Sequence, residues 1–355
     1  MAVTVALAGD TMLGRDVAEV LAHSTPRPLF TPAVRHAVRD ADLFLLNLEC
    51  CVSDRGSPVG LPGKTFFFRG PPRAADVLAG LGVDVAVLAN NHALDYGPEA
   101  LLDTRTRLAR AGIRSVGAGP TVTEARAPLR LAAGGLRLGI VAITDHPAEF
   151  AADPDRPGVA YADLWHEDVP RWLTDTIREL ARETDLVLVS AHWGPNMTAR
   201  PVPHVLRAAP ALTDAGADLV IGHSAHVFHG FTRHVLFDLG DFIDDYAVHP
   251  ALRNDLGLLW LVTLDEHGPL RTEAVPLALD HCHTRLADRA EYRWIADRLI
   301  RACAELGTDV VDEGGRLRAL WRRSAARASR PDHRGSDHHG PDHRGTGPSR
   351  DRSTA

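Results

Sequence analysis

Short apolar runs alternate with stretches of helical spacing along the first part of the chain. Four apolar runs of strand length predict strands, at residues 2–8, 43–48, 83–89 and 113–117. Between them, apolar residues recur at helical spacing over residues 15–22, 72–81 and 97–110. Pro98 suits the first turn of the last of these helices. This alternation of strand and helix predicts a sheet that is covered by helices.

The middle of the chain shows a different pattern. Gly134 and Gly135 join two apolar segments within residues 128–143, which is typical of a β-hairpin. Helical spacing returns at 166–183 and 203–215, and further strands are predicted at 185–190, 217–222, 233–239, 256–264 and 270–279. Both halves therefore supply strands. We expect an α/β fold in which two packed sheets have helices outside them.

The pattern changes again beyond residue 285. Residues 286–305 and about 312–328 carry helical spacing, so we expect a C-terminal helical segment, 286–328, packed on a main domain of residues 1–285. From residue 329 the sequence repeats Pro-Asp-His-Arg-Gly and lacks apolar residues. Because such a segment cannot bury a core, we expect residues 329–355 to be disordered.

Composition and charge exclude several classes of protein. A net charge of −7, with histidine neutral, argues against a nucleic-acid partner, which normally selects a basic surface. No apolar run approaches the length of about 20 residues that a membrane-spanning helix needs. The four cysteines form no CxxC pair, and the N-terminal apolar run lacks the basic region of a signal peptide. We therefore expect a reduced, cytoplasmic compartment.

Five apolar runs lead directly into side chains that can bind metals. Ligands gather outside the carboxyl ends of strands in α/β sheets, so we expect these side chains to converge on one crevice. Carboxylate, amide and imidazole groups together suit Mn, Fe or Zn, with Mg possible. The residues at the five strand ends are Asp10, Asn47 with Glu49, Asn90 to His92, His192, and His223 with His226.

Each of these segments has an ordinary explanation when taken alone. Asp10 after Gly9 is typical of a turn with a capping carboxylate, and His192 before Trp193 is typical of a buried histidine with satisfied hydrogen bonds. The run from Asn90 to His92 is harder to explain in this way, because three polar side chains after a buried strand are costly unless they are bonded. The occurrence of all five segments together favours a single site.

The ordered set of motifs resembles the CapA-type capsule (poly-γ-glutamate) biosynthesis proteins. The resemblance spans roughly residues 1–280. Its motifs are Gly9 to Arg15, Asn47-Leu48-Glu49, Asn90-Asn91-His92 with Asp95-Tyr96-Gly97, His192-Trp193-Gly194, Gly222 to His226, and Asp238 to Phe242. This family belongs to the calcineurin-like metallophosphatase superfamily. The resemblance therefore implies a four-layer α/β/β/α sandwich with two divalent metal ions.

The resemblance also implies a role for each matching residue. A first metal would be bound by Asp10 and His226, a second by Asn91, His192 and His223, and Glu49 would bridge the two. His92 would protonate the leaving group, with Asp95 as a further catalytic residue and Asn90 as a substrate-binding residue. Two features depart from the superfamily pattern. The segment Gly222 to His226 has one residue more between its two histidines than the superfamily's Gly-His-x-His, which puts the role of His223 in question. The other departure lies in the first motif. Met12 stands where a histidine ligand is usual, so we expect one metal position to be weak, vacant or filled from elsewhere.

Basic side chains near these motifs predict an anionic substrate. Lys64 is the single lysine of a chain that otherwise uses arginine, which suggests that a compact ammonium group is needed there. We hypothesise that Lys64 and Arg69 bind a phosphate or a glutamate-like carboxylate, and that Arg15 neutralises substrate charge. The simpler explanation for Arg15 is a solvated helix arginine.

The expected function is that of a metal-dependent, phosphoesterase-like hydrolase acting on an anionic small molecule or polymer. A non-catalytic role in polymer assembly or binding stays open, and so does the oligomeric state. A serine hydrolase is disfavoured, since the sequence around Ser224 ends in His226 rather than glycine and no helical pattern follows it.

Overall fold

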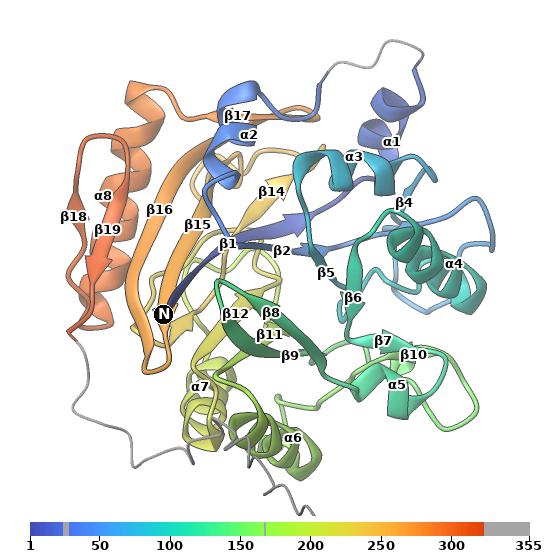
Figure 1. Cartoon of the computed structure of the whole chain (residues 1–355). Coiled ribbons are helices and arrows are strands. Elements are labelled where there is room, and N and C mark those ends of the chain that lie inside the picture. The colour runs from blue at the N-terminus through green and yellow to red at the C-terminus, as the bar shows by residue number, and fades with distance from the viewer. Residues whose placement is uncertain (24–27, 167, 323–355) are drawn as a thin grey trace, which may run out of the picture.

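The computed structural model describes residues 1–23, 28–166 and 168–322, so the predicted disorder of residues 329–355 lies outside the described residues. A large mixed sheet is built around β1, which pairs in parallel with β2 and antiparallel with β15 (Figure 1). Its strands are β1 (Ala2–Thr11), β2 (Leu43–Leu48), β5 (Val85–Val87), β6 (Arg114–Val116), β14 (Asp241–Ile243), β15 (Leu256–Asp265), β16 (Gly268–Asp280), β17 (His283–Leu286), β18 (Val311–Asp312) and β19 (Leu317–Leu320).

A second, smaller sheet is formed by the middle of the chain. The predicted hairpin is present as β8 and β9, and β9, β11 and β12 run parallel. The strands are β8 (Leu129–Ala133), β9 (Leu136–Thr144), β11 (Leu186–His192), β12 (Leu219–His223) and β13 (Val235–Leu236). Two short pairs lie outside both sheets: β3 (Cys51–Val52) with β4 (Arg69–Gly70), and β7 (Ala118–Gly119) with β10 (Gly158–Val159).

Helices cover the outer faces of the two sheets (Figure 1). Helices α2 (Pro32–Val38), α3 (Ala74–Leu81) and α4 (Gly97–Arg110) share a core with the large sheet. Helices α6 (Arg171–Glu183) and α7 (Pro203–Ala215) share a core with the small sheet. The remaining helices are α1 (Arg15–Ala22), α5 (Val122–Arg126), α8 (Arg289–Glu305) and a 3₁₀ turn at Ala148–Phe150.

The alternation of side chains along each strand explains why four layers form. On β1, Val5 and Leu7 point into a central core shared with Ile140 and Leu188 of the small sheet. The intervening Ala6 and Ala8 belong instead to the core beneath the helices of the large sheet. Successive side chains of a strand point to opposite faces, so each sheet needs a partner on both sides. The predicted α/β/β/α sandwich is confirmed.

The C-terminal part departs from the prediction in one element. Helix α8 is present, and it packs in the central core against β15 and β16. The helix expected from about 312 is wrong over residues 317–320, which form β19 and pair with β16. Leu317 and Ala319 are buried there while Leu320 is exposed, which is the period of a strand. No helix among the described residues is long and apolar enough to cross a membrane.

Candidate metal centre

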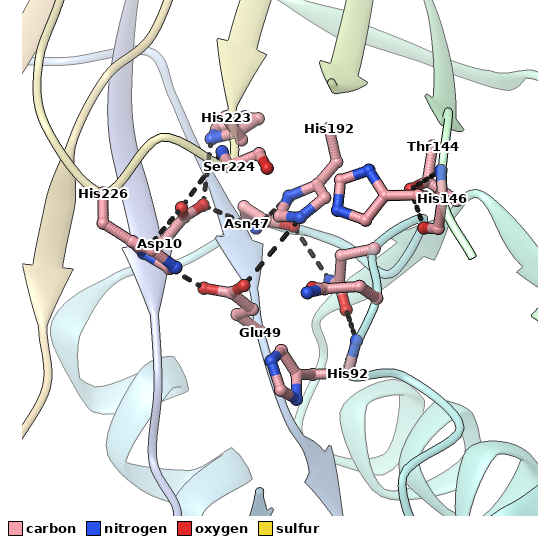
Figure 2. Close-up of polar contacts among 12 residues, drawn as sticks. Asp10, Asn47, Glu49, His92, Thr144, His146, His192, His223, Ser224 and His226 are labelled. Carbon is pink, nitrogen blue, oxygen red and sulfur yellow. Dashed lines mark hydrogen bonds and ion pairs between the residues drawn. The ribbon is translucent and has the colours of Figure 1, made fainter. Parts of the chain in front are cut away.

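Four buried acidic and imidazole side chains meet where strands of both sheets end. Asp10, Glu49, His226 and Asp241 each place one ligand atom within 4.8 Å of the others. Asp10 lies near the end of β1, and Asp241 begins β14, which pairs with β1 in a register that sets the two residues side by side. Glu49 directly follows β2, and His226 lies in the loop after β12 (Figure 2). This group could hold a divalent cation.

The loop after β12 turns sharply and brings its histidine against the carboxylates. Ser224 and His226 both have positive φ, of 108° and 57°, and the Ser224 N–H donates to Asp10 Oδ2 at 3.2 Å. Nδ1 of His226 lies 2.8 Å from Asp241 Oδ1, 3.4 Å from Asp10 Oδ2 and 3.8 Å from Glu49 Oε2. One imidazole therefore faces three carboxylates.

Several polar atoms around this point have no hydrogen-bond partner among the described residues. An unpartnered buried polar atom costs free energy, so a cluster of them requires an explanation. His192 Nε2 is one such atom, and it faces Glu49 Oε1 at 3.8 Å. The others include both Glu49 oxygens, Asn91 Oδ1, His223 Nε2 and Asp241 Oδ2. Oxygen and imidazole nitrogen donors of this kind are metal ligands, so the residues present fit a divalent cation.

The electrostatics of the group point the same way. Burial and the neighbouring Asp10 carboxylate raise the pKa of Glu49 well above its ordinary value. Burial and Asp244 do the same to the pKa of Asp241. Burial also acts to raise the pKa of Asp10, but the His223 imidazole and other nearby histidines outweigh it and hold that pKa low. Burial lowers the pKa of His192 well below its usual range, which leaves the neutral imidazole that a metal requires.

Two asparagine side chains form a hydrogen-bonded series that ends at Asp10. Asn47 Nδ2 donates to Asp10 Oδ1 at 2.7 Å, and Asn90 Nδ2 donates to Asn47 Oδ1 at 3.0 Å. Asn90 Oδ1 in turn accepts the His92 N–H at 3.1 Å. The side chain of Asn90 is thus bonded within the protein, and its contact with a substrate stays a prediction.

Beside the four-residue group, Asp95 links His92 through a hydrogen bond and Lys64 through an ion pair. His92 Nδ1 lies 2.6 Å from Asp95 Oδ2, and Lys64 Nζ lies 2.7 Å from Asp95 Oδ1 and 3.0 Å from the Asn91 carbonyl oxygen. The His92 ring also stacks on Phe68 at 4.1 Å. Burial lowers the pKa of His92 to about 4 although Asp95 acts to raise it. Lys64 therefore lies where it can orient the Asp95 carboxylate, which in turn contacts His92.

The two arginines take different positions. Arg15 forms an ion pair with Asp245 at 3.2 Å, and its guanidinium lies 5.8 Å from the centre of the Phe68 ring, the same ring that stacks on His92. Arg69 instead lies over the Tyr96 ring at 4.1 Å. The structure thus brings Arg15 close to the His92 side of the site through their shared neighbour Phe68. The contact of Arg69 with Tyr96 does not connect Arg69 to His92 in this way.

The sequence analysis did not assign two residues that the structure places in or beside the four-residue group, Asp241 and His146. Met12 is fully buried in the outer core and its Sδ accepts the Gly14 N–H, so it does not turn towards the cluster as a ligand would. Asp241 is the additional carboxylate in the group. The Gly240-Asp241-Phe242 motif was the sequence signal that could have identified it. His146 lies beside His192 and had no sequence signal (Figure 2).

A two-sheet sandwich with buried carboxylates and imidazoles at its strand ends is consistent with the metallophosphatase superfamily. The chain belongs to the bacterial capsule synthesis protein family PGA_cap, whose model matches residues 4–246. The predicted CapA relationship is therefore confirmed.

Several of its relatives carry names connected with polymer or capsule synthesis. A probable polyglutamine synthesis accessory protein of Mycobacterium tuberculosis is 31% identical, over 87% of this chain and 93% of the relative. The PGA biosynthesis protein CapA of Bacillus subtilis is 28% identical, over 76% of this chain and 70% of the relative. The capsule biosynthesis protein CapA of Bacillus anthracis is 26% identical, over 77% and 67% respectively.

Proposed function

We propose that this chain is a metal-dependent hydrolase of the phosphoesterase type, and that it acts on an anionic substrate in capsule or polyglutamate synthesis. One observation carries the proposal: buried oxygen and nitrogen ligand atoms without partners converge from both sheets. A structural ion-pair network would satisfy these atoms, whereas a metal centre leaves them facing a common point. The names of the relatives supply the biological setting.

Two ion positions account for the arrangement of the ligands. Asp10, His226 and Asp241 would hold the first ion, Asn91 and His192 the second, and Glu49 has an oxygen directed to each side. Divalent ions at such a site supply an activated water and neutralise charge on the attacked group. Mn, Fe or Zn suits this mixture of oxygen and nitrogen ligands, and Mg is less well matched to imidazole.

The side chains around the ions would bind and orient the substrate. His92 uses Nδ1 for Asp95, so Nε2 is the atom that could exchange a proton with the leaving oxygen. Arg15 would attract an anionic substrate towards the same side, and Lys64 would hold Asp95 in place. The buried walls keep these groups fixed before substrate arrives.

The test compares wild type with Glu49→Gln and with Glu19→Gln, the same substitution at an exposed helix position. Bound metal is measured by elemental analysis, and hydrolysis of phosphomonoester, phosphodiester and γ-glutamyl amide substrates is measured with added Mn. We expect metal and turnover in wild type and in the control, and loss of both in Glu49→Gln. Wild type that holds no Mn, Fe or Zn would overturn the proposal. Metal without turnover of any substrate class would favour the non-catalytic assembly role.

A further inference from the structure

His146 lies next to the candidate metal centre although no motif includes it. Strands β9 and β11 run parallel with Thr144 opposite His192, so the residues just after β9 emerge beside the end of β11. The rings of His146 and His192 are 5.3 Å apart between centres, with an interplanar angle of 41°. Figure 2 shows the two imidazoles side by side on the same side of Glu49.

The His146 ring is held in place by a buried carboxylate. Asp145 is 2% exposed, and its Oδ1 forms a short hydrogen bond with His146 Nδ1. Its Oδ2 accepts the Gly194 N–H at 3.0 Å and lies 3.1 Å from His204 Nε2, which locks the carboxylate from the other side. Among the described residues no group bonds Nε2 of His146, so that nitrogen is available for a ligand.

We propose that His146 is a ligand of the second metal position, oriented by Asp145; this inference rests on the proposed metal centre. A histidine that binds a metal through one nitrogen usually donates its other N–H to a carboxylate, which is the pairing seen here. Two imidazoles bound to one ion at about 2.0–2.1 Å per nitrogen have ring centres about 5 Å apart. The separation of His146 and His192 matches that geometry.

The position of His223 leaves room for this additional ligand. His223 was expected to join His192 at the second ion, but its Nδ1 lies 3.5 Å from Asp10, on the side of the first ion. His146 would supply the second imidazole in its place. The second ion would then have Glu49, Asn91, His192 and His146 around it. The His146 side chain is 28% exposed, so it lies at the solvent side of the position.

The test measures Co²⁺ binding to the full chain by competition with a chelator and by visible absorption. The variants are His146→Ala and His146→Gln, and the matched control is His166→Ala, an exposed histidine that also pairs with an aspartate through Nδ1. We expect wild type and the control to bind two ions. Both His146 variants should retain the first ion and bind the second at least about tenfold more weakly, with a changed absorption spectrum.

Three results separate this inference from the proposed function. Two ions bound with wild-type affinity and an unchanged spectrum in a folded His146 variant would overturn the inference and leave the metal centre intact. Weaker binding of the first ion in Asp241→Asn would then show that the assay detects loss of a ligand. No binding of Co²⁺ to wild type would overturn both. Thermal unfolding identifies a variant that fails to fold, and His146→Gln retains a group that can bond Asp145.

Discussion

At the scale of single residues, Glu49 is a buried carboxylate that lacks, within the described part of the chain, the hydrogen-bond partners that normally stabilise such a group. It is fully buried, both oxygens lack partners among the described residues, and the carboxylates of Asp10 and Asp241 lie close by. In the absence of a cation this arrangement costs folding free energy, because burial and the neighbouring carboxylates oppose ionisation of Glu49. The same side chain becomes stabilising when a cation binds between the carboxylates.

This change of sign gives the first prediction. In the presence of a chelator, Glu49→Gln should melt at a higher temperature than wild type, by about 2–4 °C for each kcal/mol of relief. With Mn at about 100 times its dissociation constant, wild type should gain about 2.7 kcal/mol and the variant should gain little. Scanning calorimetry with and without Mn measures both. A variant that is less stable under both conditions would mean that Glu49 is an ordinary structural residue.

Kinetic measurements on Lys64 variants can distinguish a role in orienting His92 from a role in binding substrate. Its ammonium group is bonded to Asp95 and to the Asn91 carbonyl, and its side chain is only 13% exposed. Lys64→Met should therefore lower kcat by about tenfold or more, because His92 loses its fixed orientation, and should leave KM nearly unchanged. Lys64→Arg is the matched variant that keeps the charge. A raised KM with an unaltered kcat would instead support the hypothesis that Lys64 binds substrate.

His229 predicts how stability depends on pH. Burial lowers its pKa to about 4, with Nε2 bonded to the Thr198 carbonyl oxygen. The unfolded chain therefore binds more protons than the folded chain between pH 6.5 and about 4, so this residue removes stability as pH falls through that window. Relative to His229→Gln, wild type should lose about 2 kcal/mol between pH 7 and pH 5. Urea unfolding at both pH values measures the difference, and an equal loss in the variant would contradict it.

At the scale of elements, the close approach of β1 and β14 assembles the candidate centre. The Asp10 N–H donates to the Gly240 carbonyl at 3.0 Å, and a Cβ on Gly9 would lie 1.7 Å from that oxygen. Only glycine fits at position 9 with the strands so close. The pairing of Asp10 with Asp241 therefore depends on a residue that itself binds nothing.

Two glycine substitutions test this dependence. Gly9→Ala should destabilise the chain by about 2 kcal/mol or more and weaken metal binding, because β14 must move away from β1. Gly80→Ala is the matched control: it lies in helix α3 with nothing within 4 Å of a new Cβ, so it should stabilise by about 0.5–1 kcal/mol. Urea midpoints and metal titrations measure both. Equal effects of the two substitutions would show that the β1–β14 approach is not tight.

Elements with a clear period could be predicted from the sequence, and short ones could not. Strands β1, β2, β11 and β15 and helices α4 and α7 were predicted nearly at their observed bounds, because each carries a long apolar run or stripe. β14 has three residues, and its partner β1 lies more than 200 residues away in the chain, so no local pattern identifies it. β19 was mistaken for a helix because its four residues form a strand only by pairing with β16.

The residues of the candidate site also fall into those that the sequence could predict and those that it could not. Asp10, Glu49, His192 and His226 follow strands that the sequence reveals, and the structure brings them together. Asp241 and His146 are placed by β14 and by the loop after β9, which only the three-dimensional arrangement defines. Met12 gave the physical reason to expect a substitute ligand, but not its identity.

At the scale of the whole molecule, the candidate centre draws on both sheets. Asp10 and Asp241 belong to the large sheet, while His192 and the loop carrying His226 belong to the small one. Elsewhere the sheets are joined by the apolar core between them, which is non-directional. A bound cation would add directional bonds across the two layers at one edge. Local opening of either sheet at that edge would then require loss of the cation.

This coupling predicts the pattern of hydrogen exchange. Addition of Mn should slow amide exchange at residues 188–194 and 222–230, from the small sheet, and at 238–246, by up to about 100-fold at 100 times the dissociation constant. Strand β19 is separated from β1 by β16 and β15 in the large sheet, so its exchange should not change. Glu49→Gln should show no response to Mn anywhere. Protection confined to one sheet would mean that the ion binds within a single layer, and the two sheets would then be held together by apolar packing alone.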